Sequence, residues 1–429
     1  MDLITFLAIV VILLIIYNYV KDKVPDSLKD IHSISFFSMA ISQLMKRGGN
    51  DKLYLRCKEY FEKDGVIKVK FIPLFSRKWV CVITDPVFAK EMFLQTDVFP
   101  KLIFNEIVPN SAAERLFSVN VVHSNGDAWK RYRRICNPAF KTLPVHLFVE
   151  KALKLMHILQ KVDNKPIEFI KAYKFKYRRF TLDILGKLPL ILILIKTQIL
   201  SRWNSNGDLL ELMIKACEDP DNQKLSDTEL RCNLAILMVA GHDTSAVALS
   251  TLLYLLAVNK NVQEKAREEV LRVLGDDLIP SSEQHASLKY LNMIIRENLR
   301  LYPSVGGLPL RVVTEDIKLK NFLIPTGTTI SLFVYGIHHS SKLWKNPEEF
   351  LPERFENEHD NYSWLAFGGG SRIYLGNNFS LIEQRIVLCL LLRKYEISLP
   401  QNSIHKNQLE FKSEIYPFPI DLIFKRRNE

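Results

Sequence analysis

The residues with the clearest chemical potential lie in one segment, Ala240-Gly-His-Asp-Thr-Ser245. A glycine and four polar residues interrupt an apolar helical stretch, and glycine inside a helix costs about 1 kcal/mol relative to alanine. Thr244 and Ser245 can bond to carbonyls one turn earlier and bend the helix. The segment is therefore either a tolerated kink or a groove where a small ligand meets the Asp243 carboxylate and the Thr244 hydroxyl. His242 has no second ligand candidate beside it and is interpreted as a solvated or core histidine.

A second pair of chemically active residues is Glu297-x-x-Arg300. Residues three apart share one helix face, so the carboxylate and the guanidinium can meet. On a surface such a pair contributes little. The flanking Leu291, Ile294, Ile295, Leu299 and Leu301 instead favour a buried helix, where an ion pair must be fully satisfied. We therefore expect a third partner, and the candidate is Arg354.

The elements that carry these residues are mostly helical. The capping box Ser226-Asp-Thr-Glu229 opens a helix that is predicted to run to about Val258. β-branched, alternating stretches predict paired strands over 65–72 and 78–84, and Asp85-Pro86 starts a helix that ends near Leu94. The chain is mostly helical from Asp127 onward, with short strands at 317–319 and 328–333. The predicted fold class is mainly α with a minor β-sheet.

The first 20 residues predict a membrane anchor. Leu3 to Val20 is apolar except for Thr5 and Asn18, and as a helix it would span about 27 Å, close to the thickness of a bilayer core. A cleaved signal peptide is the alternative, although Asp2 and the absence of a small-residue cleavage site disfavour it. Lys21 and Lys23 place the following domain on the cytoplasmic side. We expect an N-terminal transmembrane helix over 1–20, a linker over 21–40 and one domain over 41–429.

Composition narrows the partners. The 429 residues carry 58 basic and 47 acidic side chains, a net charge of +11. A spread-out excess of this kind favours a membrane surface or an acidic protein partner. Nucleic acid is not expected, because no zinc-finger, basic-zipper or aromatic-basic strand pattern is present. The six cysteines are scattered singly, which predicts reduced thiols on the cytosolic side and neither a disulfide framework nor a metal site.

Several segments together resemble the cytochrome P450 family. Ala240–Ser245 resembles its oxygen-binding helix, Glu297-x-x-Arg300 its buried ion pair, and Phe350-Leu-Pro-Glu-Arg-Phe355 the segment that donates the third ionic partner. Phe367-Gly-Gly-Gly-Ser-Arg-Ile-Tyr-Leu-Gly376 is similar to the haem loop. Smaller matches are Trp129-x-x-x-Arg133, Ile324-Pro-x-Gly-Thr328 and Trp344-x-x-Pro347. The resemblance covers about residues 50 to 425 and implies the cytochrome P450 fold.

The resemblance implies haem as the cofactor and assigns roles to individual residues. The catalytic pair would be Asp243 and Thr244, which relay protons to bound dioxygen. The structural triad would be Glu297, Arg300 and Arg354. Arginines recur at the haem propionates because charge-assisted hydrogen bonds are strong. The implied cofactor-binding residues are Trp129, Arg133, Ala240, Gly241, Arg311, Phe367, Gly370, Arg372, Tyr374 and Gly376.

The partners implied by the resemblance are an NADPH-dependent reductase, a lipophilic small molecule and membrane lipid, with the endoplasmic reticulum as the usual location. The basic residues Lys130, Arg131, Arg134 and Lys141 follow one another along the segment that begins at Asp127. They either meet an acidic reductase or form a solvated face.

Two features depart from the family pattern. Tyr374 occupies the slot of the cysteine that ligates haem iron, and Cys389, fifteen residues on, cannot replace it. A phenolate is a harder donor than a thiolate, and its pKa near 10 must fall before it can coordinate. In addition, the chain passes from Gly186 through the apolar stretch Leu188–Ile195 almost directly toward the long helix. The F and G helices, the roof of the substrate site, are therefore expected to be missing between about 186 and 203.

Three hypotheses follow. The first is a haem-binding oxidoreductase of the monooxygenase lineage, using dioxygen, reductase electrons and a lipophilic substrate, with activity impaired or altered at Tyr374. The second is a haem-free pseudoenzyme that acts as a membrane-bound interaction protein. The third is a decayed or misassembled coding sequence.

Overall fold

The computed structural model describes residues 24–34, 49–70, 79–107, 109–141, 145–162, 164–171, 213, 215–217, 225–277, 280–357, 362–411 and 416–427. The predicted anchor over 1–20 and the predicted helix deletion between 186 and 203 both lie outside these residues. The described part of the chain is mainly helical with small sheets, which confirms the predicted fold class.

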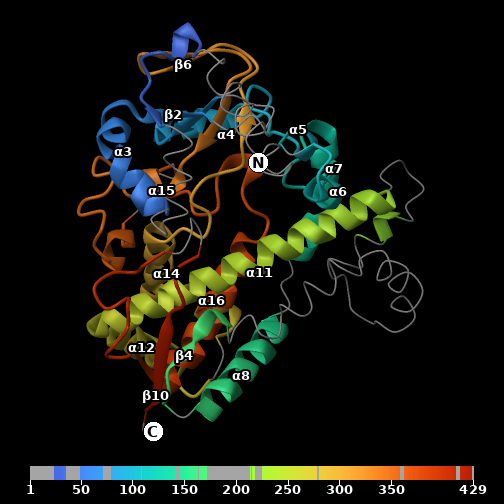
Figure 1. The fold of residues 1–429 in the computed structure, drawn as a ribbon. Helices are drawn as coiled ribbons and strands as arrows, with labels where there is room; N and C mark the ends of the chain where they lie inside the picture. The colour runs from blue at the N-terminus through green and yellow to red at the C-terminus, as the bar shows by residue number, and fades with distance from the viewer. Residues whose placement is uncertain are drawn as a thin grey trace, which may run out of the picture.

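One long helix, α11 (Asp227–Val258), runs diagonally through the molecule (Figure 1). The Ser226 side chain accepts a hydrogen bond from the Glu229 backbone N–H, and the Glu229 side chain accepts one from the Ser226 N–H, so the capping box forms as predicted. Among the described helices, α11 is the one that is long and apolar enough to cross a membrane. However, 53% of its most apolar window is buried inside the protein. The helix is therefore interpreted as the centre of the core.

Four further helices form the main hydrophobic core together with the second half of α11. The burial of their apolar side chains is the dominant stabilising term for the fold. These helices are α8 (Val145–Val162), α12 (Lys260–Leu274), α14 (Lys289–Leu301) and α16 (Asn377–Lys394). A three-stranded sheet lies beside them, in the order β4 (Ile167–Glu168), β10 (Asp421–Arg426), β9 (Tyr395–Ser398).

The larger sheet lies at the other end of the molecule (Figure 1) and has five strands in the order β1-β2-β3-β8-β5. The predicted hairpin forms from β2 (Val66–Lys70) and β3 (Trp79–Ile83), and β3 then pairs in parallel with the distant β8 (Thr329–Leu332). The outer strands are β1 (Ser33–Ile34) and β5 (Arg311–Val312). A separate hairpin is formed by β6 (Ile317–Leu319) and β7 (Phe322–Ile324). The predicted strands at 317–319 and 328–333 are thus confirmed.

Shorter helices surround this sheet or lead into the core. They are α3 (Asn50–Asp64), α4 (Pro86–Leu94), α5 (Phe104–Ile107), α6 (Ala112–Phe117), α7 (Gly126–Lys141), α13 (Ser282–Ser287) and α15 (Val334–His338), with single turns η1 (Asp26–Leu28), η3 (Pro352–Phe355) and η4 (Gly370–Arg372). As predicted, α4 begins after Asp85, whose side chain accepts from the Phe88 N–H, with Pro86 in the first turn.

The segment predicted as a linker is partly built into the fold. Leu28 and Ile31 are buried, and β1 pairs in parallel with β2. Residues 24–34 therefore belong to the globular unit. The sequence reading missed this because the segment is polar and each element is only two or three residues long.

Candidate functional site

A cavity of about 260 Å³ lies between the middle of α11, the helix α7 and the loop that precedes α16. Trp129 and Arg133 reach it from α7, Ala240 and Thr244 from α11, and Arg311 from β5. The loop before α16 contributes Phe367, Arg372 and Tyr374. Eight of the predicted site residues thus line a single cavity.

The loop that carries Tyr374 is shaped by glycine. Gly370 has φ +60°, and a Cβ atom there would stand 2.9 Å from the Phe93 backbone oxygen. Both the backbone conformation and the space therefore require glycine at this position. The Tyr374 N–H donates to the Phe367 carbonyl at 3.0 Å, which closes the loop. This tight turn holds the side chain of residue 374 at the cavity.

Four cationic side chains line the cavity, and no carboxylate lines its described part. We call Lys101, Arg133, Arg311 and Arg372 the cation cluster. Their hydrogen bonds go to neutral acceptors: Lys101 Nζ donates to Val122 O at 2.8 Å, Arg133 to Ile373 O at 2.9 Å, and Arg311 to Phe99 O at 2.5 Å. Arg372 donates to Ser124 O at 2.8 Å and to Asn125 Oδ1 at 3.1 Å.

Burial and mutual repulsion make this cluster costly. Burial, followed by the charges of Arg311, Arg372 and Arg133, holds the pKa of Lys101 well below its usual value. Burial lowers the pKa of Arg311 to about 10. It also lowers that of Arg372 to about 10, with Arg311 and Arg133 adding to the effect. Buried charges are ordinarily paired, so the cluster is built for an anionic ligand.

One donor atom of Arg372 also lacks an acceptor. Its Nε is buried and has no hydrogen-bond partner in the described structure. The guanidinium carbon lies 4.0 Å from the centre of the Trp129 ring, which is within the range of a cation–π interaction. An unsatisfied buried donor is rare and often marks a binding site. The cluster therefore suits the two carboxylates of haem.

Tyr374, at the position of the iron ligand, does not suit haem iron. The Tyr374 ring stacks on Phe367, with 6.3 Å between ring centres and 7° between planes. A Cβ atom at Gly376 would stand 3.2 Å from the Tyr374 phenol oxygen, so the ring covers its own loop. Burial, and then the charge of Glu383, raises the pKa of Tyr374 to about 12. The neutral phenol is favoured, and neutral phenol is a poor iron ligand.

Cysteine does not compensate for Tyr374. All six cysteines are buried, and none of them lines the described part of the cavity. Burial raises the pKa of Cys389 to about 12. Groups of three or more histidine, cysteine or acidic residues that could hold a metal ion are absent from the described residues. The cation cluster thus fits the carboxylates of haem, whereas the described lining of the cavity lacks the cysteine thiolate that would bind the iron.

The polar residues of α11 divide between two surroundings. Thr244 lines the cavity and its hydroxyl donates to Ala240 O at 2.6 Å. Ser304 donates to the Thr244 carbonyl at 3.0 Å. Asp243 does not line the cavity and instead accepts a hydrogen bond from Tyr416 at 2.6 Å. A Cβ atom at Gly241 would meet nothing within 4 Å, so this glycine is not required by close packing; of His242 only its place in α11 is described.

The three residues predicted as a structural triad lie together. Arg300 donates two hydrogen bonds to Glu297, at 2.8 and 2.9 Å, and Arg354 donates a third at 3.0 Å. Glu297 and Arg300 are fully buried. The remaining donors of Arg300 reach His338 O and Glu349 O. All the charges are therefore paired or hydrogen-bonded, which is the condition under which a buried ion cluster is tolerated.

The basic residues of α7 are only partly free. Arg131 pairs with Glu229 at the start of α11, and Lys130 pairs with Asp127. Arg134 and Lys141 are exposed. Two of these four basic residues of α7 are therefore paired with acidic neighbours.

Sequence reasoning missed Lys101, Ser304 and Tyr416. Lys101 reaches the cavity because an isolated bridge pairs it with Arg311, and Tyr416 comes from a segment far along the chain. The sequence gives one indication of its role: Lys101 is a charged residue between two apolar pairs, Phe99-Pro100 and Leu102-Ile103.

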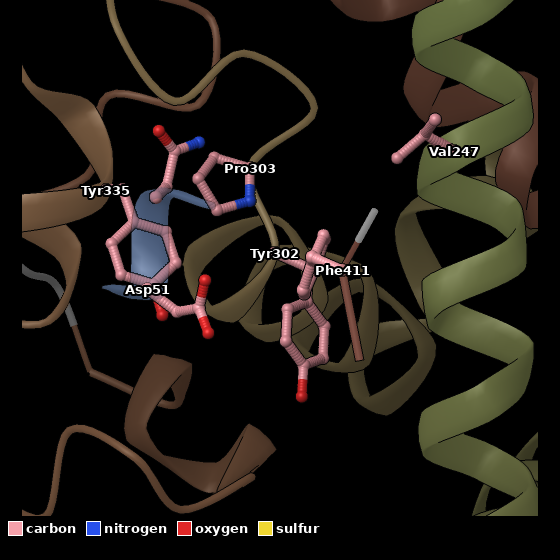
Figure 2. Close-up of a pocket in the computed structure, with 7 residues that line it drawn as sticks. Asp51, Val247, Tyr302, Pro303, Tyr335 and Phe411 are labelled. Carbon is pink, nitrogen blue, oxygen red and sulfur yellow. The ribbon is translucent and has the colours of Figure 1, made fainter. Parts of the chain in front are cut away.

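A second cavity lies between α3, the end of α14 and α11 (Figure 2). Figure 2 shows Asp51 and Tyr335 at one side and Val247 of α11 opposite them. Its volume is only about 10 Å³, room for about one water molecule. Asp51 Oδ1 is buried there without a partner, so a water suits the space and a larger ligand does not.

Comparison with known proteins gives a consistent picture. A family model described as cytochrome P450 matches residues 183–421. Cytochrome P450 4A24 of Sus scrofa is 36% identical over 194 residues, 44% of this chain and 38% of that protein. Cytochrome P450 3A13 of Mus musculus is 31% identical over 272 residues, 59% of this chain and 53% of that protein. Cytokinin hydroxylase of Arabidopsis thaliana is 37% identical over 240 residues, 55% and 45% of the two chains. The chain spans about half the length of the relatives it matches.

Proposed function

This chain belongs to the cytochrome P450 family, and on that premise we propose that it is a membrane-associated haem protein of the monooxygenase lineage whose activity is altered at Tyr374. Haem is the cofactor that the family implies. The observation that carries the proposal is the cation cluster, in which the buried Arg311 and the half-buried Lys101, Arg133 and Arg372 surround one cavity without a carboxylate among the described lining residues.

Arg133, Arg311, Arg372 and Lys101 would hold the haem carboxylates, and Trp129 would support Arg372 through its ring. Phe367 and the loop shaped by Gly370 would also contact the haem. Haem with a thiolate ligand supplies oxygen activation. Tyr374 does not provide that thiolate, so no oxygen-activating step follows from this arrangement.

The proton-handling role of α11 is proposed for Thr244 alone among residues at the cavity wall. Its hydroxyl hydrogen is committed to Ala240 O, and the hydroxyl oxygen can still accept a hydrogen bond from a molecule in the cavity. Asp243 is held by Tyr416, so it can join a relay only if that hydrogen bond is exchanged. This is a second reason to propose an altered activity.

The family context extends the proposal to partners. We propose an NADPH-dependent reductase as electron donor, with Arg134 and Lys141 as exposed basic contacts on α7, and a lipophilic small molecule as substrate. An anchor over residues 1–20 would hold the protein at the endoplasmic reticulum membrane with its domain in the cytosol.

The second candidate is a haem-free pseudoenzyme that acts as a membrane-bound interaction protein. The observation that favours it is Tyr374, which covers Gly376 and lacks the ionisation that iron ligation needs. The buried cluster of Glu297, Arg300 and Arg354 serves the fold under either function.

Haem reconstitution separates the two candidates. Full-length protein purified in detergent is titrated with haem, and its absorption spectrum and thermal stability are recorded. A Soret shift that saturates at one haem per chain, with a rise in the unfolding temperature, is the expected result. A stable, monodisperse protein that shows neither change would establish the haem-free candidate instead.

A further inference from the structure

We propose that this cavity recognises a tetrapyrrole through its carboxylates and that iron contributes little to binding. The inference rests on the proposed function, since it concerns the same site, and it specifies which part of the ligand the cavity binds. It predicts that an iron-free porphyrin is as good a ligand as haem.

The first argument is the charge imbalance of the cavity. Lys101, Arg311 and Arg372 present cationic groups whose hydrogen bonds in the described structure all go to neutral oxygens. Arg311 is 3% exposed, so water screens its charge poorly. A ligand carboxylate entering here gains charge-assisted hydrogen bonds and relieves the repulsion among the cations.

The second argument is an unused donor in a fixed direction. Arg372 Nε is buried and unpartnered, while its other two nitrogens are tied to Ser124 O and Asn125 Oδ1. Asn125 is fixed in turn, because its side-chain amide donates to Lys101 O and accepts from Lys101 N–H. The guanidinium is thus preorganised, and preorganised groups bind at low entropic cost.

The third argument concerns the residues that could bind iron. No cysteine or histidine lines the described part of the cavity. The phenol oxygen of Tyr374 lies over the loop, 3.2 Å from where a Cβ of Gly376 would stand, and its ring is stacked on Phe367. Apolar residues such as Leu237, Leu299 and Leu308 contribute the rest of the surface. A flat macrocycle is therefore held by apolar contact and by its carboxylates.

The test compares three ligands on the wild-type full chain in detergent: haem, iron-free protoporphyrin IX and protoporphyrin IX dimethyl ester. Binding is followed by quenching of tryptophan fluorescence and by thermal shift. We expect the dissociation constants of haem and protoporphyrin IX to agree within about threefold. The ester, which has no carboxylate charge, should bind at least about tenfold more weakly, because one hydrogen bond to a charged group is worth about 1.5–3 kcal/mol.

Single substitutions test which side chains determine the affinity. Arg372→Met should weaken haem and protoporphyrin IX equally, by about tenfold or more. Tyr374→Phe, which removes only the hydroxyl, should leave both affinities within about twofold of wild type. Lys318→Met replaces an exposed lysine of β6, in the separate β6–β7 hairpin and outside the cavity lining, and is the matched control without effect. Circular dichroism checks that each variant folds, and the ester comparison needs no variant.

The outcomes are distinct. Haem binding more than tenfold tighter than protoporphyrin IX, with loss of that advantage in Tyr374→Phe, would overturn this inference and leave the haem-protein function standing. Equal binding of the ester would overturn it as well, because binding would then depend on apolar contacts and not on the carboxylates. Failure of both haem and protoporphyrin IX to bind would overturn the inference and the proposed function together.

Discussion

Arg133 of α7 donates a hydrogen bond to the carbonyl oxygen of Ile373 at 2.9 Å. The bond joins this helix to the loop at the residue immediately before Tyr374. The backbone at the ligand position is therefore held by Arg133, by the Tyr374 N–H bond to Phe367 O and by the shape of Gly370. None of these contacts depends on which side chain stands at 374.

Because the loop is held independently of that side chain, Tyr374→Cys should bring a thiolate to the cavity without rebuilding the loop. In the haem-reconstituted variant we expect the thiolate-type band in the reduced, carbon monoxide-bound spectrum, and the wild-type protein should lack it. Tyr374→Ser is the control, since it is equally small and cannot supply a thiolate. A variant that binds haem fully but shows no such band would mean that residue 374 does not face the iron.

The site was predictable from sequence where residues lie close in the chain. Trp129 and Arg133, Phe367 to Gly376, and Glu297 with Arg300 form short motifs whose spacing is set by one helix or one turn. Lys101 and Tyr416 carry no such signal. The bridge to Arg311 brings Lys101 into place across more than 200 residues, and Tyr416 meets Asp243 across 173 residues. Local patterns do not encode contacts over such separations.

The buried cluster around Glu297 predicts a large stability effect. Glu297→Gln leaves Arg300 and Arg354 buried without a counter-charge, which should lower the free energy of unfolding by about 3–5 kcal/mol. Glu396→Gln is the matched control, because its pair with Lys260 is largely exposed, and it should change stability by less than about 1 kcal/mol. Urea unfolding followed by circular dichroism measures both. Equal effects of the two substitutions would show that the burial of the cluster does not matter.

The hydrogen bond from Tyr416 to Asp243 ties the C-terminal segment to the middle of α11 at 2.6 Å. A bond to a carboxylate is worth about 1.5–3 kcal/mol, so Tyr416→Phe should destabilise the protein by about that amount. Tyr254→Phe is the control with a neutral acceptor, because Tyr254 donates to the His405 carbonyl at 3.1 Å, and it should cost about 1 kcal/mol. The single variant Asp243→Ala and the double variant with Tyr416→Phe complete a double-mutant cycle. A coupling energy near zero would rule out the bond as an anchor.

The parts of the fold that lie in long periodic segments were also predictable. The helix α11 and its capping box, the β2–β3 hairpin and the start of α4 all follow from local pattern and capping chemistry. The segment 24–34 was interpreted as a linker, because strand β1 is only two residues long and acquires its register from β2. Burial of Leu28 and Ile31 decides its structure, and that burial depends on the finished sheet.

His285 predicts a pH dependence of stability. The ring is buried in α13, neither nitrogen has a partner in the described structure, and burial, with Arg385 second, lowers its pKa to about 4. The unfolded value is about 6.5, so between these values the unfolded chain binds one more proton than the folded protein. Stability therefore falls as the pH falls from about 6.5 toward 4 and is unaffected by this group above about pH 7.5.

His285→Leu removes that proton uptake while filling a similar apolar volume. Relative to wild type, the variant should gain about 2 kcal/mol in the free energy of unfolding between pH 7.5 and pH 5. His123, whose pKa burial and Lys101 also lower to about 4, stays in both proteins and cancels from the difference. Urea midpoints at pH 5, 6, 7 and 7.5 measure it. A difference that does not change with pH would mean that His285 is solvated, and that α13 does not hold its ring in the core.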